Sequence, residues 1–242
     1  MQLFMLPYAG GNRYSYNFII NTIKSHRIQP NVLELPGRGR RFNEPVILNI
    51  EEAIEDYVRQ IKALRNGKEF IIYGHSMGAN LGFYVSKKLE IAGDNPFVFI
   101  ASGSPGPLPL DLFEANGSLS DMELKKKLQE LGGTSDEILE NPEVFQFFKK
   151  SIKADFAVLD DELSLINSIV PIDAPIIALM GTHEDKVEQI TNWKHLTRSS
   201  FSCTTIRGNH FFIHHYPERI MKILIRKYQS LESDILSAIS KS

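Results

Sequence analysis

A serine at position 76 stands in the stretch GHSMG, residues 74–78, which has the spacing G-x-S-x-G. Hydrolases use this spacing to expose a serine hydroxyl on a sharp turn, where a neighbouring base removes its proton and makes it a nucleophile. The motif alone is weak evidence, because at average glycine usage it arises by chance in roughly one chain in ten. The residues around it decide whether Ser76 is a candidate nucleophile.

The sequence on either side of Ser76 has the character that this chemistry needs. An apolar run, FIIY at residues 70–73, predicts a buried strand before it, and residues 80–92 predict a helix after it. A nucleophile of this type belongs between a strand and a helix. The flanking glycines leave room for a tight, strained turn, and the helix amino terminus favours developing negative charge. We therefore predict that Ser76 is the nucleophile; the alternative is a Gly/Ser turn without chemistry.

One of the seven histidines must act as the base for Ser76. In this fold the nucleophile, acid and base follow one another in that order, so the base is expected towards the end of the chain. We favour His210, which directly follows a short predicted strand and precedes a predicted helix. His75 is interpreted as packing beside Ser76, and His214 and His215 as surface or supporting residues. The candidates in the last part of the chain are His183, His195, His210, His214 and His215.

The acid is expected directly after the apolar run PIIALM, at residues 175–180. A carboxylate there would hold the imidazole in the correct tautomer and stabilise the imidazolium. Two adjacent residues in the following loop, Glu184 and Asp185, have the required side chain. Either one could serve, and the alternative for each is a solvated loop charge.

The negative oxygen of a tetrahedral intermediate needs two backbone N–H donors. One comes from the residue after the nucleophile, which here is Met77, and the other from the loop after an early strand. That loop is PYAGG, residues 7–11, where two glycines allow the backbone to approach a substrate closely. Tyr8 is the predicted second donor, and an ordinary Gly-Gly turn is the alternative.

The elements that must position these residues alternate along the chain. Short apolar runs predict buried strands at residues 3–6, 31–35, 70–73, 97–101, 175–180 and 203–206. Segments with helical spacing lie at residues 17–25, 50–64, 80–92 and 217–236. This alternation predicts an α/β-hydrolase fold, with a mostly parallel central sheet flanked by helices. Residues 1–242 are predicted to form a single domain.

One region, at about residues 107–166, interrupts this alternation. It contains helical patterns but no convincing strand, and it predicts a helical insertion between two strands of the sheet. We interpret it as a lid over the substrate site, since long insertions in such folds often carry function. A surface crossover is the alternative. Phe145, Phe147 and Phe148 are candidates for an acyl pocket, although lid core is the preferred interpretation.

Composition limits the classes of function. The 242 residues carry a net charge of −2, so the composition suggests neither a nucleic-acid-binding protein nor a polybasic patch that binds membranes. With Cys203 as its one cysteine, the chain has no internal disulfide, as is typical of a reducing cytoplasm. No apolar stretch has the length of a bilayer span, and the first residues lack the pattern of a signal peptide. We expect a cytoplasmic monomer.

Several longer motifs make the chain resemble a known family, the type II thioesterases that accompany non-ribosomal peptide and polyketide synthetases. They are LPYAGGN, LELPGRGRRFNEP, YGHSMGANLGF, LQELGGTSDEILENPEVFQFF, IKADFAVLD and GNHFFI, and they span the whole sequence. The resemblance implies an editing hydrolase that removes wrong or stalled acyl groups from the phosphopantetheine arm of a carrier protein. It implies the same nucleophile, base and oxyanion donors, and no metal or diffusible cofactor.

The resemblance also bears on the acid. In the family pattern an Asp stands three residues after the glycine that ends the strand, and here that register holds Glu184, with Asp185 one residue later. We favour Asp185, because the triad acid of this family is regularly Asp, and keep Glu184 as the alternative. Three basic residues, Arg38, Arg40 and Arg41, are candidates for contact with an acidic carrier protein; a solvated loop is an equal alternative.

Two other functions remain open. A small-molecule carboxylesterase or a general acyl-CoA thioesterase would use the same triad. An inactive hydrolase fold that serves as a binding module is less favoured, because all three triad residue types occur here in the right order.

Overall fold

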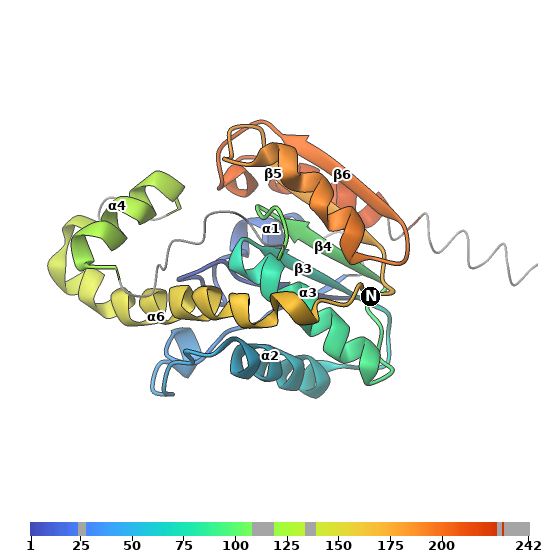
Figure 1. Cartoon of the computed structure of the whole chain (residues 1–242), viewed down its shortest axis with the longest axis horizontal. Helices are drawn as coiled ribbons and strands as arrows, with labels where there is room; N and C mark the ends of the chain where they lie inside the picture. Colours follow the sequence, from blue (N-terminus) through green and yellow to red (C-terminus); the bar gives the residue numbers. More distant parts are fainter. Residues whose placement is uncertain (24–27, 108–118, 134–138, 227–228, 230–242) are drawn as a thin grey trace, which may run out of the picture.

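The computed structural model describes residues 1–23, 28–107, 119–133, 139–226 and 229 (Figure 1). Within these residues, six strands form one sheet in the order β2-β1-β3-β4-β5-β6, and all five pairings are parallel. The strands are β1 (Gln2–Leu6), β2 (Gln29–Val32), β3 (Phe70–His75), β4 (Val98–Ser102), β5 (Ile176–Gly181) and β6 (Phe201–Ile206). The predicted α/β fold with a parallel sheet is confirmed.

Helices connect successive strands. They are α1 (Asn17–Ile23), α2 (Ile50–Leu64), α3 (Met77–Ile91), α4 (Asp121–Leu131) and α6 (Pro142–Asp161), with short 3-10 helices η1 (Gly39–Arg41), η2 (Glu162–Ser168), η3 (Val187–Leu196) and η4 (Phe212–His214). Residues 217–226 are also helical. α2 has the predicted bounds because its amino end is capped: the Asn49 side chain accepts a hydrogen bond from the Glu52 N–H at 3.1 Å.

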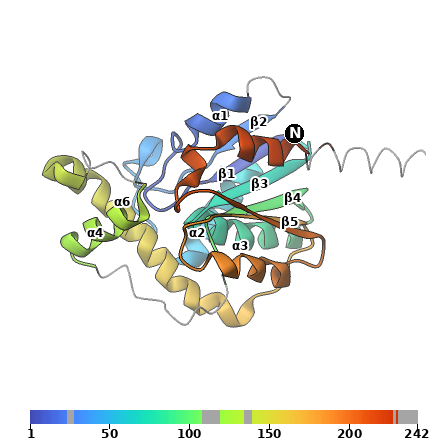
Figure 2. The same ribbon diagram turned by 90° about the horizontal axis from the view of Figure 1, so that it is seen from above.

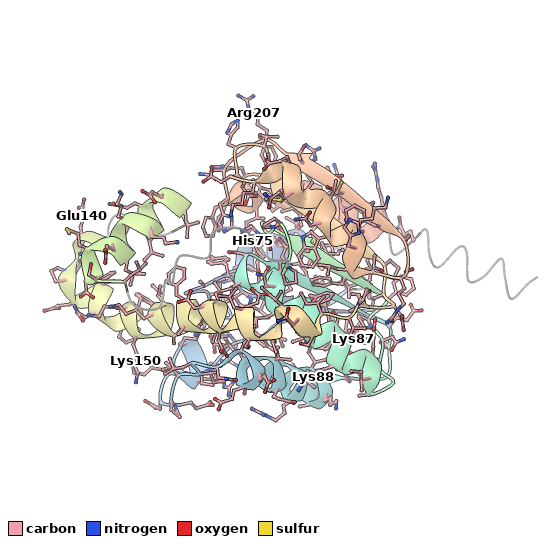
Figure 3. All side chains as sticks on the ribbon, viewed as in Figure 1. His75, Lys87, Lys88, Glu140, Lys150 and Arg207 are labelled. Carbon is pink, nitrogen blue, oxygen red and sulfur yellow. The ribbon has the colours of Figure 1, made fainter. Side chains whose placement is uncertain are left out.

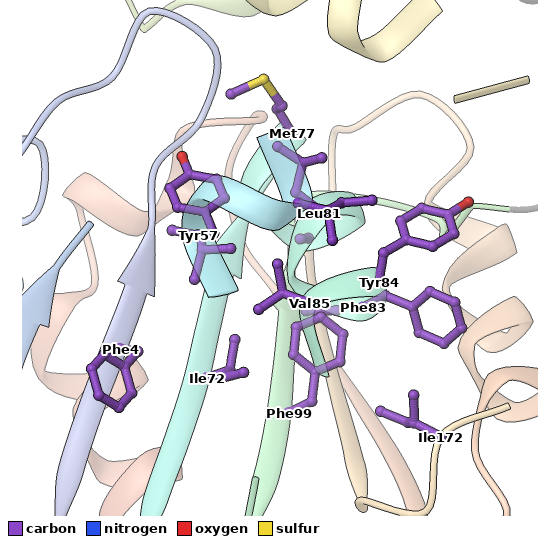
Figure 4. Close-up of a cluster of buried hydrophobic side chains, with 14 of the residues drawn as sticks. Phe4, Tyr57, Ile72, Met77, Leu81, Phe83, Tyr84, Val85, Phe99 and Ile172 are labelled. Carbon is purple, nitrogen blue, oxygen red and sulfur yellow. The ribbon is translucent and has the colours of Figure 1, made fainter. Parts of the chain in front are cut away.

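Helices cover both faces of the sheet (Figure 2), and alternate residues of the strands belong to two different core clusters. Phe4, Ile72 and Phe99 belong to the core cluster that includes residues of α2, α3 and η3, part of which is drawn in Figure 4. Leu3, Ile71 and Ile100 face the opposite way, against α1 and the helix at residues 217–226. The sheet is therefore covered on both faces, which explains why its central strands are continuous apolar runs.

Some boundaries differ from the predictions. β2 begins at Gln29, two residues before the predicted start, because Gln29 pairs with Gln2 at the beginning of β1. β3 continues past the predicted end through Gly74 to His75, since both residues still pair with β4. α3 begins at Met77, three residues before the predicted start. The predicted C-terminal helix is present at residues 217–226, and most of the remainder of that prediction lies outside the described residues.

The segment between β4 and β5 contains α4, α6 and η2, and its described residues form no strand before residue 166, as predicted. Its two longer helices project to one side of the sheet (Figure 1) and share a small apolar core of their own, which includes Leu128 and Phe156. The end of α6 is tied to the main body, where Asp161 accepts a hydrogen bond from the Ile50 N–H at 2.9 Å. The single-domain assignment and the function of this segment as a lid stay predictions.

No helix in the described ranges combines the length and the apolar character that crossing a bilayer requires.

Candidate active site

Ser76 lies on a strained turn between β3 and α3. Its φ of 55° and ψ of −121° place a non-glycine residue in a sparsely populated region of backbone space, at a cost of about 1–3 kcal/mol. The two motif glycines permit this turn: a Cβ atom on Gly74 would overlap the carbonyl of Gly78, and one on Gly78 would overlap the carbonyl of Leu6. The predicted reason for the glycine spacing therefore agrees with the geometry.

His210 and Glu184 form a hydrogen-bonded pair at the same edge of the sheet. The His210 Nδ1 atom lies 2.6 Å from the Glu184 Oε2 atom, and the two side chains are only 16% and 6% exposed. The other carboxylate oxygen of Glu184 accepts a hydrogen bond from the Gly181 N–H at 2.6 Å. A carboxylate can only accept a hydrogen bond, so the proton of a neutral His210 lies on Nδ1 and is donated to Glu184. The lone pair on Nε2 is then available to act as a base.

The expectation that Asp185 contacts the imidazole is wrong: the structure places Glu184 there, and Asp185 is exposed. The reason lies in the turn after β5. The Glu184 N–H donates to the Gly181 carbonyl at 3.2 Å, so the chain folds back and Glu184 returns towards the sheet edge. The extra methylene of Glu lets its carboxylate reach both the Gly181 N–H and His210.

The ring of His75 connects the elbow with His210. The centroids of the two imidazoles lie 5.0 Å apart, and the ring of Tyr8 lies 6.0 Å from His75. His75 is fully buried inside the molecule (Figure 3), and its Nδ1 atom lies 2.9 Å from Ser102 Oγ. Burial, with a smaller effect of His210, holds the pKa of His75 well below its ordinary value. His75 is therefore neutral, and it supports His210 without adding a charge.

The two predicted oxyanion donors lie close to the elbow. Met77 is the first residue of α3, and an N–H in the first turn of a helix has no acceptor within that helix. The loop that carries Tyr8 begins where β1 ends, and the carbonyls of Leu6 and Pro7 lie directly against Gly78. The fold therefore brings the Tyr8 backbone to the elbow, as a second donor requires.

Comparison with known proteins agrees with this geometry. The family of the thioesterase domain matches residues 1–228. The chain belongs to this thioesterase family. A relative named linear gramicidin dehydrogenase LgrE, from Brevibacillus parabrevis, is 30% identical over 94% of this chain and 88% of its own. A second, the probable anguibactin biosynthesis thioesterase AngT from Vibrio anguillarum, is 26% identical over 91% and 88%.

The crystal structure of ClbQ, from the colibactin NRPS/PKS pathway, has the same fold as this thioesterase. It superposes with a TM-score of 0.87, at 24% identity, over 96% of this chain and 98% of ClbQ. The resemblance inferred from the sequence motifs is thereby confirmed.

A cavity of about 190 Å³ in the thioesterase opens between the loop after β1 and the helical insertion. Phe148 and Ile152 of α6 line it on the insertion side, whereas Phe145 lies in the insertion's own core and Phe147 is 56% exposed. The remaining lining residues are Tyr8, Ala9, Gly10, Asn12, Ser15 and Gly133. In the part of the chain described here, no three His, Cys, Asp or Glu side chains are grouped as a metal site would need.

The three arginines between β2 and α2 differ in their surroundings. Arg38 is buried in an ion pair with Asp155, and Arg41 pairs with Asp56 and with an adjacent glutamate. The interpretation as a contact for an acidic partner is therefore wrong for Arg38, because its side chain is buried. For Arg41, which is partly exposed and has its charge matched within the chain, the contact stays a prediction. Arg40 is exposed.

Sequence reasoning also missed Asp155. The sequence holds one signal for it, because Asp155 lies among the buried residues of α6, directly before Phe156. A charge at a buried position is costly unless it is paired. Its partner Arg38 lies 117 residues away in the sequence, and a contact between residues so far apart cannot be predicted without the fold.

Proposed function

We propose that this thioesterase hydrolyses acyl groups from the phosphopantetheine arm of carrier proteins and serves a peptide or polyketide synthetase as an editing, type II enzyme. The observation that carries the proposal is the His210–Glu184 pair beside the strained Ser76 elbow. The names of similar proteins support a synthetase-bound thioester as the substrate class. AngT is named for anguibactin biosynthesis, and ClbQ for a colibactin NRPS/PKS pathway.

In the proposed first step, Ser76 Oγ attacks the thioester carbonyl while His210 Nε2 takes the hydroxyl proton. Glu184 stabilises the imidazolium that forms, without itself becoming protonated. The carbonyl oxygen becomes negative and accepts hydrogen bonds from the N–H groups of Met77 and Tyr8. Each such donor contributes about 3 kcal/mol to transition-state stabilisation.

In the second step the C–S bond breaks and the acyl group stays on Ser76. His210 returns its proton to the sulfur, although a thiol with a pKa of about 8.5 leaves readily as a thiolate. A water molecule then loses a proton to His210 and attacks the acyl-serine, which releases the carboxylic acid and restores the hydroxyl of Ser76. This scheme needs no metal and no diffusible cofactor.

The cavity between the loop after β1 and the insertion, which has the proposed donor Tyr8 in its lining, favours a short acyl group. Its volume of about 190 Å³ lies below the roughly 300–1,000 Å³ of sites that enclose drug-sized ligands. It is bordered by Tyr8 on one side and by Phe148 and Ile152 on the other, so a small aliphatic acyl chain fits its lining.

The direct test is hydrolysis of an acetyl-loaded carrier protein by the wild type and by Ser76→Ala. We expect kcat to fall by at least about 10³-fold in the variant, because the other triad members have no nucleophile to activate. Circular dichroism and a thermal melt of the variant serve as the folding control. Activity that survives in a folded Ser76→Ala protein would remove Ser76 from the mechanism.

Two further measurements separate the alternatives. The kcat/KM for the acetyl carrier protein should exceed that for acetyl-CoA and for a simple carboxylic ester; equal values for the CoA thioester would favour a general acyl-CoA thioesterase. A fluorophosphonate probe should label Ser76, and a wild-type protein that resists labelling would favour an inactive binding module.

A further inference from the structure

We propose that Arg38 and Asp155 form a positioning pair, which fixes the loop bearing the oxyanion donor Tyr8 and couples it to helix α6. This inference rests on the proposed function only in taking Tyr8 as an oxyanion donor. Neither residue touches substrate, so both act through the backbone of residues 8–11.

The pair is bidentate and buried. Arg38 Nη1 lies 2.5 Å from Asp155 Oδ2, and Nη2 lies 2.6 Å from Oδ1. The side chains are 6% and 1% exposed. A planar guanidinium that meets both oxygens of a carboxylate fixes orientation as well as distance, which a single contact would not do.

The remaining contacts of the pair go to the loop after β1. Asp155 Oδ2 also accepts a hydrogen bond from the Gly10 N–H at 2.7 Å, and Arg38 Nη1 donates to the Gly11 carbonyl at 3.3 Å. The Gly11 N–H in turn donates to the Tyr8 carbonyl at 2.8 Å and closes the turn. The peptide units of Gly10 and Gly11 are therefore held from both sides, two residues beyond the proposed donor.

The pair also brings three distant segments together. Arg38 comes from the loop after β2, Asp155 from the middle of α6, and Gly10 from the loop after β1. Gly10 has a φ of 76°, and a Cβ atom there would approach Ile152 Cγ1 of α6 at 2.9 Å. Helix and loop are thus in close contact at this point, so a shift of α6 is transmitted to the loop.

Stability alone does not account for such a pair. Removing two charges from water is expensive, and a well-packed apolar replacement of a buried ion pair is often neutral or stabilising. What an apolar replacement cannot supply is an acceptor for the Gly10 N–H and a donor for the Gly11 carbonyl. The geometry therefore assigns the pair to the placement of the loop.

The decisive variant is the double replacement Arg38→Met/Asp155→Leu, which leaves no unpaired charge; circular dichroism checks that it folds. We expect its kcat to fall between about 10- and 10³-fold, with KM changed little, because an oxyanion donor acts mainly in the transition state. Its melting temperature should stay near or above that of the wild type. The assay is hydrolysis of p-nitrophenyl acetate, which needs no carrier protein.

Two other variants complete the design. Arg38→Lys keeps Asp155 charged and hydrogen-bonded to the Gly10 N–H but loses the bidentate contact between guanidinium and carboxylate. Its kcat should therefore lie between those of the wild type and the double variant. The matched control is Arg65→Met/Asp94→Leu, which removes a bidentate pair of 2.8 and 2.9 Å near the other edge of the sheet. The control should leave kcat unchanged.

The outcomes separate this inference from the proposed function. A folded Arg38→Met/Asp155→Leu protein with wild-type kcat would overturn the positioning role, and so would an equal loss in the control. A wild type that hydrolyses p-nitrophenyl acetate but no acyl carrier protein would overturn the editing function alone. A wild type inactive on both substrates would overturn both.

Discussion

The carboxylate of Glu184 has both oxygens engaged, one by His210 and one by the Gly181 N–H. A group held at two points keeps a fixed direction, so the imidazole that depends on it is also fixed. Asp185 is one residue further and exposed to solvent. The two adjacent carboxylates therefore differ sharply in what they do for His210.

This difference predicts the result of neutralising each residue. Glu184→Gln keeps the size of the side chain but removes the charge that stabilises the imidazolium, and kcat should fall by about 10²- to 10⁴-fold. Asp185→Asn is the matched control and should change kcat by less than about threefold, as expected for an exposed loop residue. Steady-state hydrolysis of an acetyl thioester measures both. A larger loss in Asp185→Asn than in Glu184→Gln would reverse the assignment.

At the scale of elements, the end of α4 reaches the loop of the proposed base. α4 ends at Leu131 and is capped by Gly132, which has a φ of 76°, and the next residue, Gly133, lies directly against the ring of Phe211. That ring is 5.2 Å from the imidazole of His210 and 4.9 Å from the ring of Tyr8. The segment Leu131-Gly132-Gly133 therefore brings the insertion into contact with Phe211, whose ring lies close to both His210 and Tyr8.

A single methyl group should disturb this contact. The Cβ atom of Gly133→Ala would overlap the Phe211 ring, which must then move against His210 and Tyr8. We expect a fall in kcat of about tenfold, because small displacements of catalytic groups are costly. Gly133→Ala/Phe211→Leu restores the space and should recover part of the activity. Gly67→Ala is the control for strain far from the site: no atom lies within 4 Å of the added methyl, but the φ of 76° strains the backbone of the variant. A loss of kcat there equal to that of Gly133→Ala would contradict the contact.

The elements also show where sequence reasoning succeeds and where it stops. The bounds of α2 can be predicted from the sequence because they depend on local features, an Asn cap and regularly spaced apolar residues. The start of α3 was missed because glycine at position 78 looks like a helix breaker, although it is required there by the nearby Leu6 carbonyl. Pairs joined only by the fold, such as Arg38 and Asp155, have no local signature.

For the candidate site, residue type and chain order are enough to nominate Ser76 and His210, and their catalytic roles stay predictions. The choice between Glu184 and Asp185 depended on the path of one turn, which is fixed by the hydrogen bond to Gly181 and by the position of β5 relative to β6. The number of residues between Gly181 and the acid does not predict the path of that turn.

At the scale of the whole molecule, Glu162 lies where α6 passes into η2 and is fully buried. Its Oε2 accepts a hydrogen bond from Asn80 Nδ2 at 2.7 Å, and Asn80 Oδ1 accepts one from Ser104 Oγ at 2.5 Å. These contacts link the insertion, the helix behind Ser76 and the loop after β4. Burial raises the pKa of Glu162 to about 7, and the Asn80 hydrogen bond offsets only part of that rise.

The raised pKa predicts how global stability depends on pH. An acid with a higher pKa in the folded state holds its proton more tightly there, so the contribution of Glu162 to the free energy of unfolding decreases as pH rises from about 4.5 to about 7 and is then constant. Glu162→Gln removes this loss. The variant should match the wild type near pH 4.5 and exceed its free energy of unfolding by roughly 3 kcal/mol at pH 8.

Urea unfolding at several pH values between 4.5 and 8 measures the difference. Glu140→Gln makes the same change of charge at an exposed position and should run parallel to the wild type. If Glu162→Gln also runs parallel to the wild type across this range, Glu162 titrates alike in the folded and the unfolded protein and the raised pKa is refuted.

The order of the strands has a consequence for the timing of synthesis. A chain emerges from its amino terminus at about 5–20 residues per second, so β1, β3 and the Ser76 elbow are available well before β5 and β6. Glu184 and His210 follow those two last strands. A nascent chain therefore carries Ser76 before the pair of Glu184 and His210 has formed, so under the proposed mechanism no thioester is hydrolysed until β6 has joined the sheet.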